Sequence, residues 1–273
     1  MTDQAEGVPV VEASGRGRAA TRDARRSLIA EQVIRRGTLT IDELVHAVGV
    51  SPMTIYRDVA ALEDAGVLRR SRGNVSALAT SLHEAGATMR LDQNPGLKTE
   101  LAKAVASRIT PGMSLMIDDS TSGVFVLRAL EGVVPLTVVT NSMLVARELE
   151  HRPSVQLFVT GGLYQGWAEA LLGRATVDMV RSMHVDVALL SASGVSEGRL
   201  YHPHEDAGDV KRAMMESART KILLLDHTKF HRHALHEFAH VRDFDLVVVD
   251  DQLAPGIIAS LRDSGVELLI VPT

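Results

Sequence analysis

Short apolar runs separated by helix-length segments are the feature that most limits how the chain can fold after residue 98. The runs are rich in Val, Ile and Leu, as strands buried on both faces of a sheet are. They cover residues 114–117, 136–140, 155–160, 185–190, 221–225, 246–249 and 267–271. Helices between strands favour parallel pairing, because each helix returns the chain to the edge where the last strand began. We therefore predict an α/β domain with a mainly parallel sheet over residues 98–273.

A different pattern comes before this domain, where apolar residues recur at helical spacing in three short segments. The expected helices cover residues 23–36, 41–48 and 52–65. Thr40 and Ser51 stand where their hydroxyls can cap the second and third helices. Pro52 occupies the first position of the third helix, where its missing N–H costs nothing. Each helix is followed by a glycine, the residue most common after a helix end: Gly37, Gly49 and Gly66.

Two extended runs follow these helices, at 67–70 and 75–78, and a turn containing Gly73-Asn74 joins them. Three helices and a hairpin in this order predict a winged helix-turn-helix. The first residues are small or charged and show no periodicity, which is typical of disorder. The predicted organisation is a disordered tail at 1–20, a winged helix-turn-helix domain at 21–78, a linker at 79–97 and the α/β domain at 98–273.

The distribution of charge separates these two domains. The whole chain has a net charge of −5, yet residues 16–77 contain eleven Arg, no Lys and only seven acidic residues. A basic N-terminal domain on an acidic body indicates that only the N-terminal domain binds a polyanion. The chain has no Cys, which excludes disulfides, thiol nucleophiles and cysteine-based zinc sites.

The third helix and the hairpin carry the side chains that we expect to contact DNA. The N-terminal half of a recognition helix reaches base edges in the major groove, while a wing reaches phosphates or the minor groove. A three-helix bundle that packs against another protein has the same pattern, but the arginine excess and the wing favour DNA. The predicted DNA-binding residues are Ser51, Met53, Thr54, Tyr56 and Arg57 on the helix, and Arg69, Arg70 and Arg72 on the wing.

The same segment carries a long motif. It runs Val50-Ser51-Pro52-Met53-Thr54-Ile55-Tyr56-Arg57-Asp58, then Leu62-Glu63, then Gly66-Val67-Leu68-Arg69-Arg70. With this motif, residues 38–70 resemble the DeoR family of bacterial regulators. The wing departs from the family, because Arg72-Gly73-Asn74-Val75 stand where the family usually has His-Gly-Gly-Ala.

Loops at the ends of three predicted strands are candidates for a ligand site. Hydroxyls and free backbone N–H groups at a helix N-terminus, as at 119–123, suit a phosphate. Ligands of open parallel sheets bind at the carboxyl ends of the strands, and a lysine near such a loop can pair with a phosphate. The predicted effector-binding residues are Asp119, Ser120, Thr121, Ser122, Thr140, Asn141, Ser142, Gly161, Gly162, Lys211 and Lys229.

Five short motifs lie in this region, at 119–123, 140–142, 161–162, 210–214 and 226–230. Through them, residues 98–250 resemble the DeoR sensor domain, which is similar in fold to ribose-5-phosphate isomerase. The phosphate loop departs from the family pattern, since its central Gly is replaced by Thr121 or displaced. The resemblance implies a repressor of carbohydrate metabolism genes that is controlled by a phosphorylated sugar or a related metabolite.

Two enzymatic alternatives follow from particular residues. His236-Glu237-Phe238-Ala239-His240 matches the His-Glu-x-x-His pattern of zinc proteases, which needs both histidines on one face of a helix. The match lies in a His-rich tract on a short segment, so we expect no catalytic metal; whether the tract binds a metal stays open. A sugar-phosphate isomerase-like enzyme would need a base and an electrophile, with Asp118, Asp119, Asp186 and Lys211 as candidates. The predicted DNA-binding N-terminal domain favours a transcription regulator without enzymatic activity or cofactor over either enzyme.

The expected partners follow from the two domains. No apolar run is long enough to span a bilayer and the N-terminus has no signal-peptide pattern, so we expect a cytoplasmic protein with no membrane partner. The double-stranded DNA operator and a small phosphorylated effector are the predicted ligands. A single head of this size buries little DNA surface, so we expect a homodimer or homotetramer.

Overall fold

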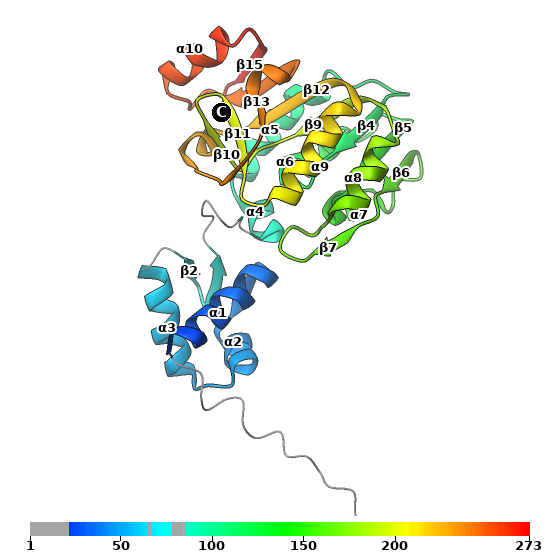
Figure 1. Cartoon of the computed structure of the whole chain (residues 1–273). Helices are drawn as coiled ribbons and strands as arrows, with labels where there is room; N and C mark the ends of the chain where they lie inside the picture. The colour runs from blue at the N-terminus through cyan, green and yellow to red at the C-terminus, as the bar shows by residue number, and fades with distance from the viewer. Residues whose placement is uncertain (1–21, 65–66, 78–83, 85) are drawn as a thin grey trace, which may run out of the picture.

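The computed structural model describes residues 22–64, 67–77, 84 and 86–273. The predicted tail at 1–20, the helix stop at Gly66 and linker residues 79–83 lie outside the described residues. The described residues form a smaller N-terminal head and a larger α/β domain (Figure 1). The two predicted fold types, a winged helix-turn-helix and a parallel-sheet α/β domain, are confirmed.

The head begins with three helices, α1 (Arg22–Arg36), α2 (Ile41–Val48) and α3 (Pro52–Asp64). Both predicted N-caps form. The Thr40 hydroxyl accepts the Glu43 N–H at 3.2 Å, and the Glu43 carboxylate accepts the Thr40 N–H at 2.7 Å, which completes a capping box. The Ser51 hydroxyl accepts the Thr54 N–H at 3.3 Å. Gly49 ends α2 in the left-handed conformation, with φ 73°.

The wing consists of β2 (Leu68–Ser71) and β3 (Asn74–Ala77). Ser71 pairs with Asn74, so the turn residues are Arg72 and Gly73, one position earlier than predicted. Both have positive φ, as a two-residue hairpin turn that matches strand twist requires. A third strand, β1 (Thr38–Thr40), pairs with β3 and was not predicted, because three residues are too few to show an alternating pattern.

All seven predicted strands of the α/β domain form, and together they make one parallel sheet. The spatial order is β15-β14-β12-β9-β4-β5-β6. The strands are β4 (Ser114–Ile117), β5 (Leu136–Thr140), β6 (Val155–Val159), β9 (Val185–Leu190), β12 (Ala218–Leu225), β14 (Leu246–Asp250) and β15 (Glu267–Val271).

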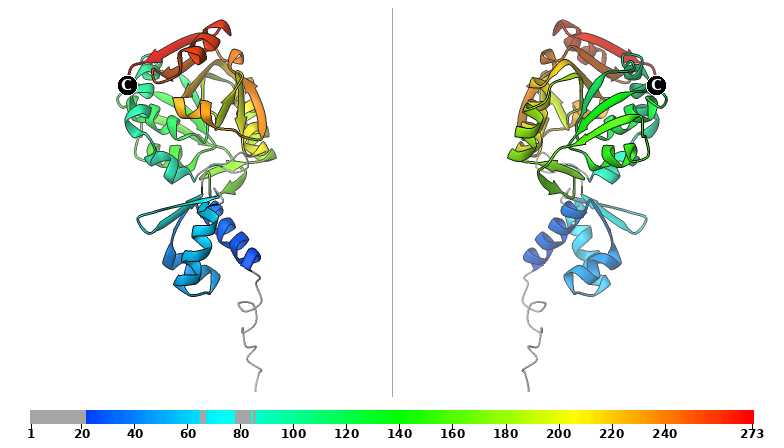
Figure 2. Two further views of the ribbon diagram at one scale, coloured as in Figure 1. Left: turned by 90° about the vertical axis from the view of Figure 1, so that its left-hand side faces the viewer. Right: turned by 90° about the vertical axis from the view of Figure 1, so that its right-hand side faces the viewer.

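Helices cover both faces of this sheet (Figure 2). Neighbouring residues of a strand point to opposite faces, so Met116 joins one buried cluster while Leu115 and Ile117 join the other. The Met116 side packs against α8 (Arg174–Arg181), α9 (Glu205–Glu216) and α10 (Pro255–Asp263). The other side packs against α5 (Pro95–Ala106), α6 (Thr121–Ala129) and α7 (Met143–Leu149).

Short antiparallel strands complete the domain. They are the hairpin β7 (Leu163–Gln165) and β8 (Ala170–Leu172), and the three-stranded sheet of β10 (Gly194–Ser196), β11 (Arg199–His202) and β13 (His236–His240). The segment that matched the zinc-protease pattern is therefore a strand. Four residues of extended chain separate its two histidines by roughly 13 Å, so the zinc-protease alternative is wrong. No cluster of metal-ligating side chains occurs among the described residues.

The segment predicted as a linker contains helical structure. The helix α4 (Ala87–Asp92) and the start of α5 lie within it. A helix of six residues is too short for its apolar spacing to stand out in the sequence. Of the helices described, none has the length and apolar character of a membrane span.

Candidate functional site

One face of α3 presents the predicted DNA-contacting side chains to solvent. Met53 is 61 % exposed and Tyr56 is 41 % exposed, and Arg57 is also exposed. The Ser51 and Thr54 hydroxyls lie 2.9 Å apart and interact with each other at the helix start. The opposite face of α3 is buried in the head, so the helix is held with its predicted reading face outward.

The wing places its arginines beside this face. Arg69, Arg70 and Arg72 are all exposed. The Arg70 guanidinium lies 5.6 Å from the centroid of the Tyr56 ring, within the range of a cation–π contact. The Arg70 N–H also donates to the Glu63 carboxylate at 2.9 Å. Arg70 therefore joins the wing to the exposed face of α3.

Two arginines of the basic segment have an internal role that the sequence analysis missed. Asp58 on α3 is buried, and its carboxylate accepts hydrogen bonds from Arg25 Nε at 2.5 Å and Arg26 Nε at 3.1 Å. These bonds tie α1 to α3. The acidic residue directly after Arg57 in the DeoR-like motif was the available signal, since an acid on the inner face of a helix needs a buried partner.

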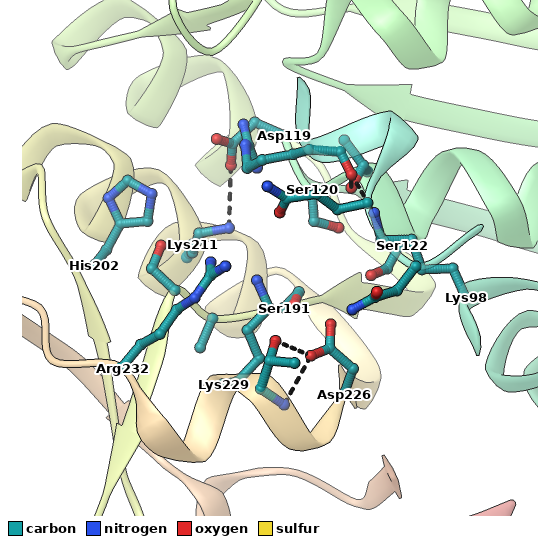
Figure 3. A pocket seen from close by; sticks show the side chains of 17 residues that line it. Lys98, Asp119, Ser120, Ser122, Ser191, His202, Lys211, Asp226, Lys229 and Arg232 are labelled. Carbon is teal, nitrogen blue, oxygen red and sulfur yellow. Dashed lines mark hydrogen bonds and ion pairs between the residues drawn. The ribbon is translucent and has the colours of Figure 1, made fainter. Parts of the chain in front are cut away.

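The second candidate site lies where the strand order of the large sheet changes direction. From β4 the chain adds β5 and β6 on one side, and then β9, β12, β14 and β15 on the other. The carboxyl ends of β4, β9 and β12 open into a pocket (Figure 3). Such switch points are where open α/β sheets bind ligands.

The base of the pocket is a buried lysine held by two aspartates. Lys211 Nζ donates to Asp118 Oδ2 at 2.5 Å and to Asp119 Oδ1 at 3.0 Å. Burial opposes ionisation of Asp119, but Lys211 outweighs it and holds the pKa of Asp119 well below its ordinary value. Burial likewise opposes the charge of Lys211, yet Asp118 and Asp119 raise its pKa. Lys211 lies in the middle of α9.

Four further cations surround the pocket. Arg90 comes from α4, Lys98 from α5, and Lys229 and Arg232 from the segment after β12. Lys98 is only 6 % exposed. Burial, and then the charge of Lys229, lower the pKa of Lys98 to about 7. The pocket therefore concentrates positive charge that Asp226 offsets only in part.

Hydroxyl groups come from two loops, each of which follows a strand of the large sheet. Ser120, Thr121 and Ser122 follow β4, while Ser191 and Ser193 follow β9. The Ser120 hydroxyl accepts the Gly123 N–H at 3.3 Å and caps α6, and the Thr121 hydroxyl donates to the Arg90 carbonyl at 3.4 Å. The Asp118 carboxylate accepts the backbone N–H groups of both loops, from Ser120 at 2.9 Å and Ser191 at 3.0 Å.

A buried histidine closes the pocket at β11. Burial lowers the pKa of His202 to about 4, so the imidazole is neutral near pH 7. The neighbouring His204 stacks on Trp167, with ring centroids 4.2 Å apart. The carbonyl of Trp167 accepts the Ala87 N–H at 2.8 Å, which links this end of the pocket to the start of α4.

The structure brings only part of the predicted effector site together. Asp119, Ser120, Thr121, Ser122, Lys211 and Lys229 line the pocket. Thr140, Asn141, Ser142, Gly161 and Gly162 are not among its lining residues. The lining residues that the sequence analysis missed include Arg90, Asn94, Lys98, Ser191, Ser193, His202, Asp226, Thr228 and Arg232.

The residues outside the pocket hold local structure. The Thr140 hydroxyl donates to the Ile117 carbonyl at 2.7 Å, and the Asn141 amide donates to the Leu171 carbonyl at 3.1 Å. Ser142 caps α7 by accepting the Val145 N–H at 3.4 Å. Gly161 and Gly162 pack beside α8, where the Gly161 carbonyl accepts the Thr176 hydroxyl at 2.7 Å.

A winged helix-turn-helix with an exposed basic face, joined to an α/β domain with a cationic switch-point pocket, defines a DNA-binding regulator with a sensor domain. Two family models match the two parts. The DeoR-like helix-turn-helix domain matches residues 25–81, and the DeoR C terminal sensor domain matches residues 93–251. The chain belongs to the DeoR family of transcription regulators.

The matches to similar proteins cover nearly the whole chain. The uncharacterized HTH-type transcriptional regulator YgbI of Escherichia coli K12 is 30 % identical, and the match covers 90 % of this chain and 96 % of that protein. The glycerol-3-phosphate regulon repressor of the same strain is also 30 % identical, over 89 % and 97 %. The putative aga operon transcriptional repressor of Escherichia coli O157:H7 is 28 % identical, over 95 % and 98 %.

Among solved structures, ribose 5-phosphate isomerase A of Methanocaldococcus jannaschii matches with 16 % identity and a TM-score of 0.38. The match covers 50 % of this chain and 55 % of that chain.

Proposed function

We propose that the protein represses carbohydrate metabolism genes and that a phosphorylated sugar or related metabolite controls it through the switch-point pocket. The cluster of Arg90, Lys98, Lys229 and Arg232 around the pocket carries this proposal. Guanidinium and ammonium groups recognise phosphate oxygens by charge-assisted hydrogen bonds. Only Asp226 and the Lys211-paired Asp119 contribute negative charge to the lining.

The rest of the lining suits the hydroxyls of a sugar or polyol. Six Ser and Thr hydroxyls supply both donors and acceptors. The Asp226 carboxylate accepts the Thr228 N–H at 3.0 Å and retains further acceptor capacity for a ligand hydroxyl. The name of the relative that regulates a glycerol-3-phosphate regulon supports an effector of this chemical class.

We propose that the pocket senses its ligand and does not convert it. Isomerisation of a sugar phosphate needs a carboxylate that takes up a proton. The low pKa of Asp119, held by Lys211, makes this group a weak base. Asp186 accepts the Ser114 N–H at 2.9 Å at the beginning of β4, the end of the strand opposite the pocket.

DNA binding is assigned to the exposed face of α3 together with the wing. A helix-turn-helix protein reads two half-sites when it is a dimer. We therefore propose that a homodimer or homotetramer binds a double-stranded operator. The effector would change how the two heads are spaced, and hence their fit to the operator.

A thermal-shift screen tests the sensing function. We expect ribose 5-phosphate, glucose 6-phosphate or glycerol 3-phosphate to raise the unfolding midpoint, because a ligand at a hundred times its Kd adds about 2.7 kcal/mol of stability. Lys229→Ala removes a pocket cation and should abolish the shift. Lys103→Ala, an exposed lysine on α5 paired with Glu100, should leave it unchanged. Equal shifts from the unphosphorylated compounds would contradict a phosphorylated effector.

A further inference from the structure

A buried carboxylate lies beside the pocket on the segment that leads from the head. Glu84 is 2 % exposed, and its Oε1 lies 3.9 Å from both Arg90 Nε and Arg232 Nη1. Both of these arginines also line the pocket. We propose that Glu84 is an internal counter-anion that competes with the effector for these two guanidinium groups. The inference rests on the proposed function, since it assumes an anionic effector in this pocket.

The contacts of Glu84 are ionic and long. The Ser193 hydroxyl also interacts with the Glu84 carboxylate, but among the described residues neither carboxylate oxygen has a hydrogen bond of ordinary geometry. Burial opposes its charge, but Arg90 and then Lys229 outweigh burial and lower the pKa of Glu84 to about 2. The carboxylate is therefore ionised and is kept buried by the same cations that face the pocket.

A ligand anion changes this balance. A phosphate or sulfate in the pocket draws Arg90 and Arg232 toward its own oxygens, because bidentate contacts near 2.8 Å are stronger than ion pairs at 3.9 Å. The negative charge of Glu84 is then buried with weaker attraction from the two arginines. A buried charge without its partner is strongly unfavourable. Anion binding should therefore expel Glu84 from its place.

The segment that carries Glu84 also touches the head. A Cβ added at Gly86 would lie 2.5 Å from the Cα of Gly37, which directly follows α1. The next residue, Ala87, donates its N–H to the Trp167 carbonyl in the sensor domain. Release of Glu84 is thus a route by which an anion in the pocket moves the heads.

Anion affinity of the full-length protein tests the competition. Sulfate is the probe, because it stays fully ionised near pH 7, and binding is measured by calorimetry. We expect Glu84→Gln to bind sulfate about tenfold more tightly than the wild type, within the usual range of coupling between sites. Glu100→Gln removes an exposed carboxylate on α5 and should bind as the wild type does. Lys229→Ala should lose the binding, which locates the sulfate in the pocket.

Hydrogen exchange tests the release. In the wild type, sulfate should speed exchange of the amides from Gly86 to Asp92, and Glu84→Gln should show the faster exchange without sulfate. If sulfate binds neither protein, the anion site and the proposed function both fail. If both proteins bind it equally, or if sulfate slows exchange in this segment, the anion site stands and the role of Glu84 is overturned. Should Glu84→Gln not fold, the wild-type exchange experiment decides alone.

Discussion

At the scale of single residues, burial decides which charges of the sensor pocket respond to pH. Lys211 and His202 do not change state near neutrality, because Asp118 and Asp119 raise the pKa of the lysine and burial lowers that of the histidine to about 4. Lys98 differs, since burial and Lys229 bring its pKa to about 7. A lysine in this state gains or loses its charge within the physiological range.

Sulfate affinity should therefore depend on pH through Lys98. Below pH 7 the ammonium is charged and attracts the anion, whereas above pH 7 the neutral amine does not. We expect the affinity to fall by about tenfold between pH 6 and pH 8, because binding favours the protonated form of a group with a pKa near 7. Calorimetric titrations of sulfate at several pH values measure this. Lys98→Arg keeps its charge throughout and should flatten the profile; an equally steep profile in this variant would assign the pH dependence to another group.

Some residues predicted for the effector site do not line the pocket, and they show what residue type alone cannot predict. Thr140, Asn141 and Ser142 have the residue types of a ligand loop, and so do Ser191 and Ser193. The first three use their side chains for the local hydrogen bonds of β5 and α7. The serines after β9 line the pocket instead. Residue type is the same in both loops, so only the place of the strand in the sheet distinguishes them.

At the scale of secondary-structure elements, local sequence patterns predicted most of the helices and strands in the structure. Caps at Thr40 and Ser51 and the seven core strands depend on residues within a few positions of one another. The elements that escaped prediction are short, such as β1 and α4, or irregular, such as β13. Their conformation depends on partners distant in sequence, as when β13 pairs with β11.

The junction of β4 and α6 offers a test of packing between elements. A Cβ added at Gly123 would lie 2.4 Å from Ile117 Cγ2. We expect Gly123→Ala to lower the free energy of unfolding by about 1–3 kcal/mol, the usual cost of overpacking a core. Gly96→Ala is the matched control on α5, where an added Cβ meets nothing within 4 Å. Thermal unfolding measures both, and equal midpoints for the two variants would show that the β4–α6 junction can relax.

At the scale of the whole molecule, head and sensor domain approach each other at Gly37 and Gly86. A Cβ added at Gly86 would lie 2.5 Å from the Cα of Gly37, and a Cβ added at Gly37 would lie 3.2 Å from the Cα of Gly86. The single tryptophan of the chain, Trp167, lies at the same junction and stacks on His204, near the switch-point pocket. The junction therefore brings residues of the head, Arg36, Gly37 and Thr38, beside Gly86, Ala87 and Trp167.

Gly86→Ala should loosen the contact between the two domains. The new methyl group would overlap the backbone of Gly37, so we expect faster hydrogen exchange of the amides at 36–38 and a shifted Trp167 emission. Gly256→Ala at the start of α10, where an added Cβ is unobstructed, is the control. Exchange at 36–38 equal to that of the wild type would mean that the junction is not a fixed contact in solution.

The sequence alone determined the two fold types, the caps of the head, the strands of the sheet and the exposed arginines of α3 and the wing. These depend on local periodicity, on side-chain chemistry within one turn or strand, and on a motif of the DeoR family. Only the tertiary structure decided the composition of the pocket. Strand order is not local: β9 and β12 lie beyond β4 on the side away from β5 and β6, and their loops bring Ser191, Asp226 and Lys229 to Asp119. The segment that links the domains adds Arg90 and Glu84, because their charges are stable in the interior only next to partners from distant parts of the chain.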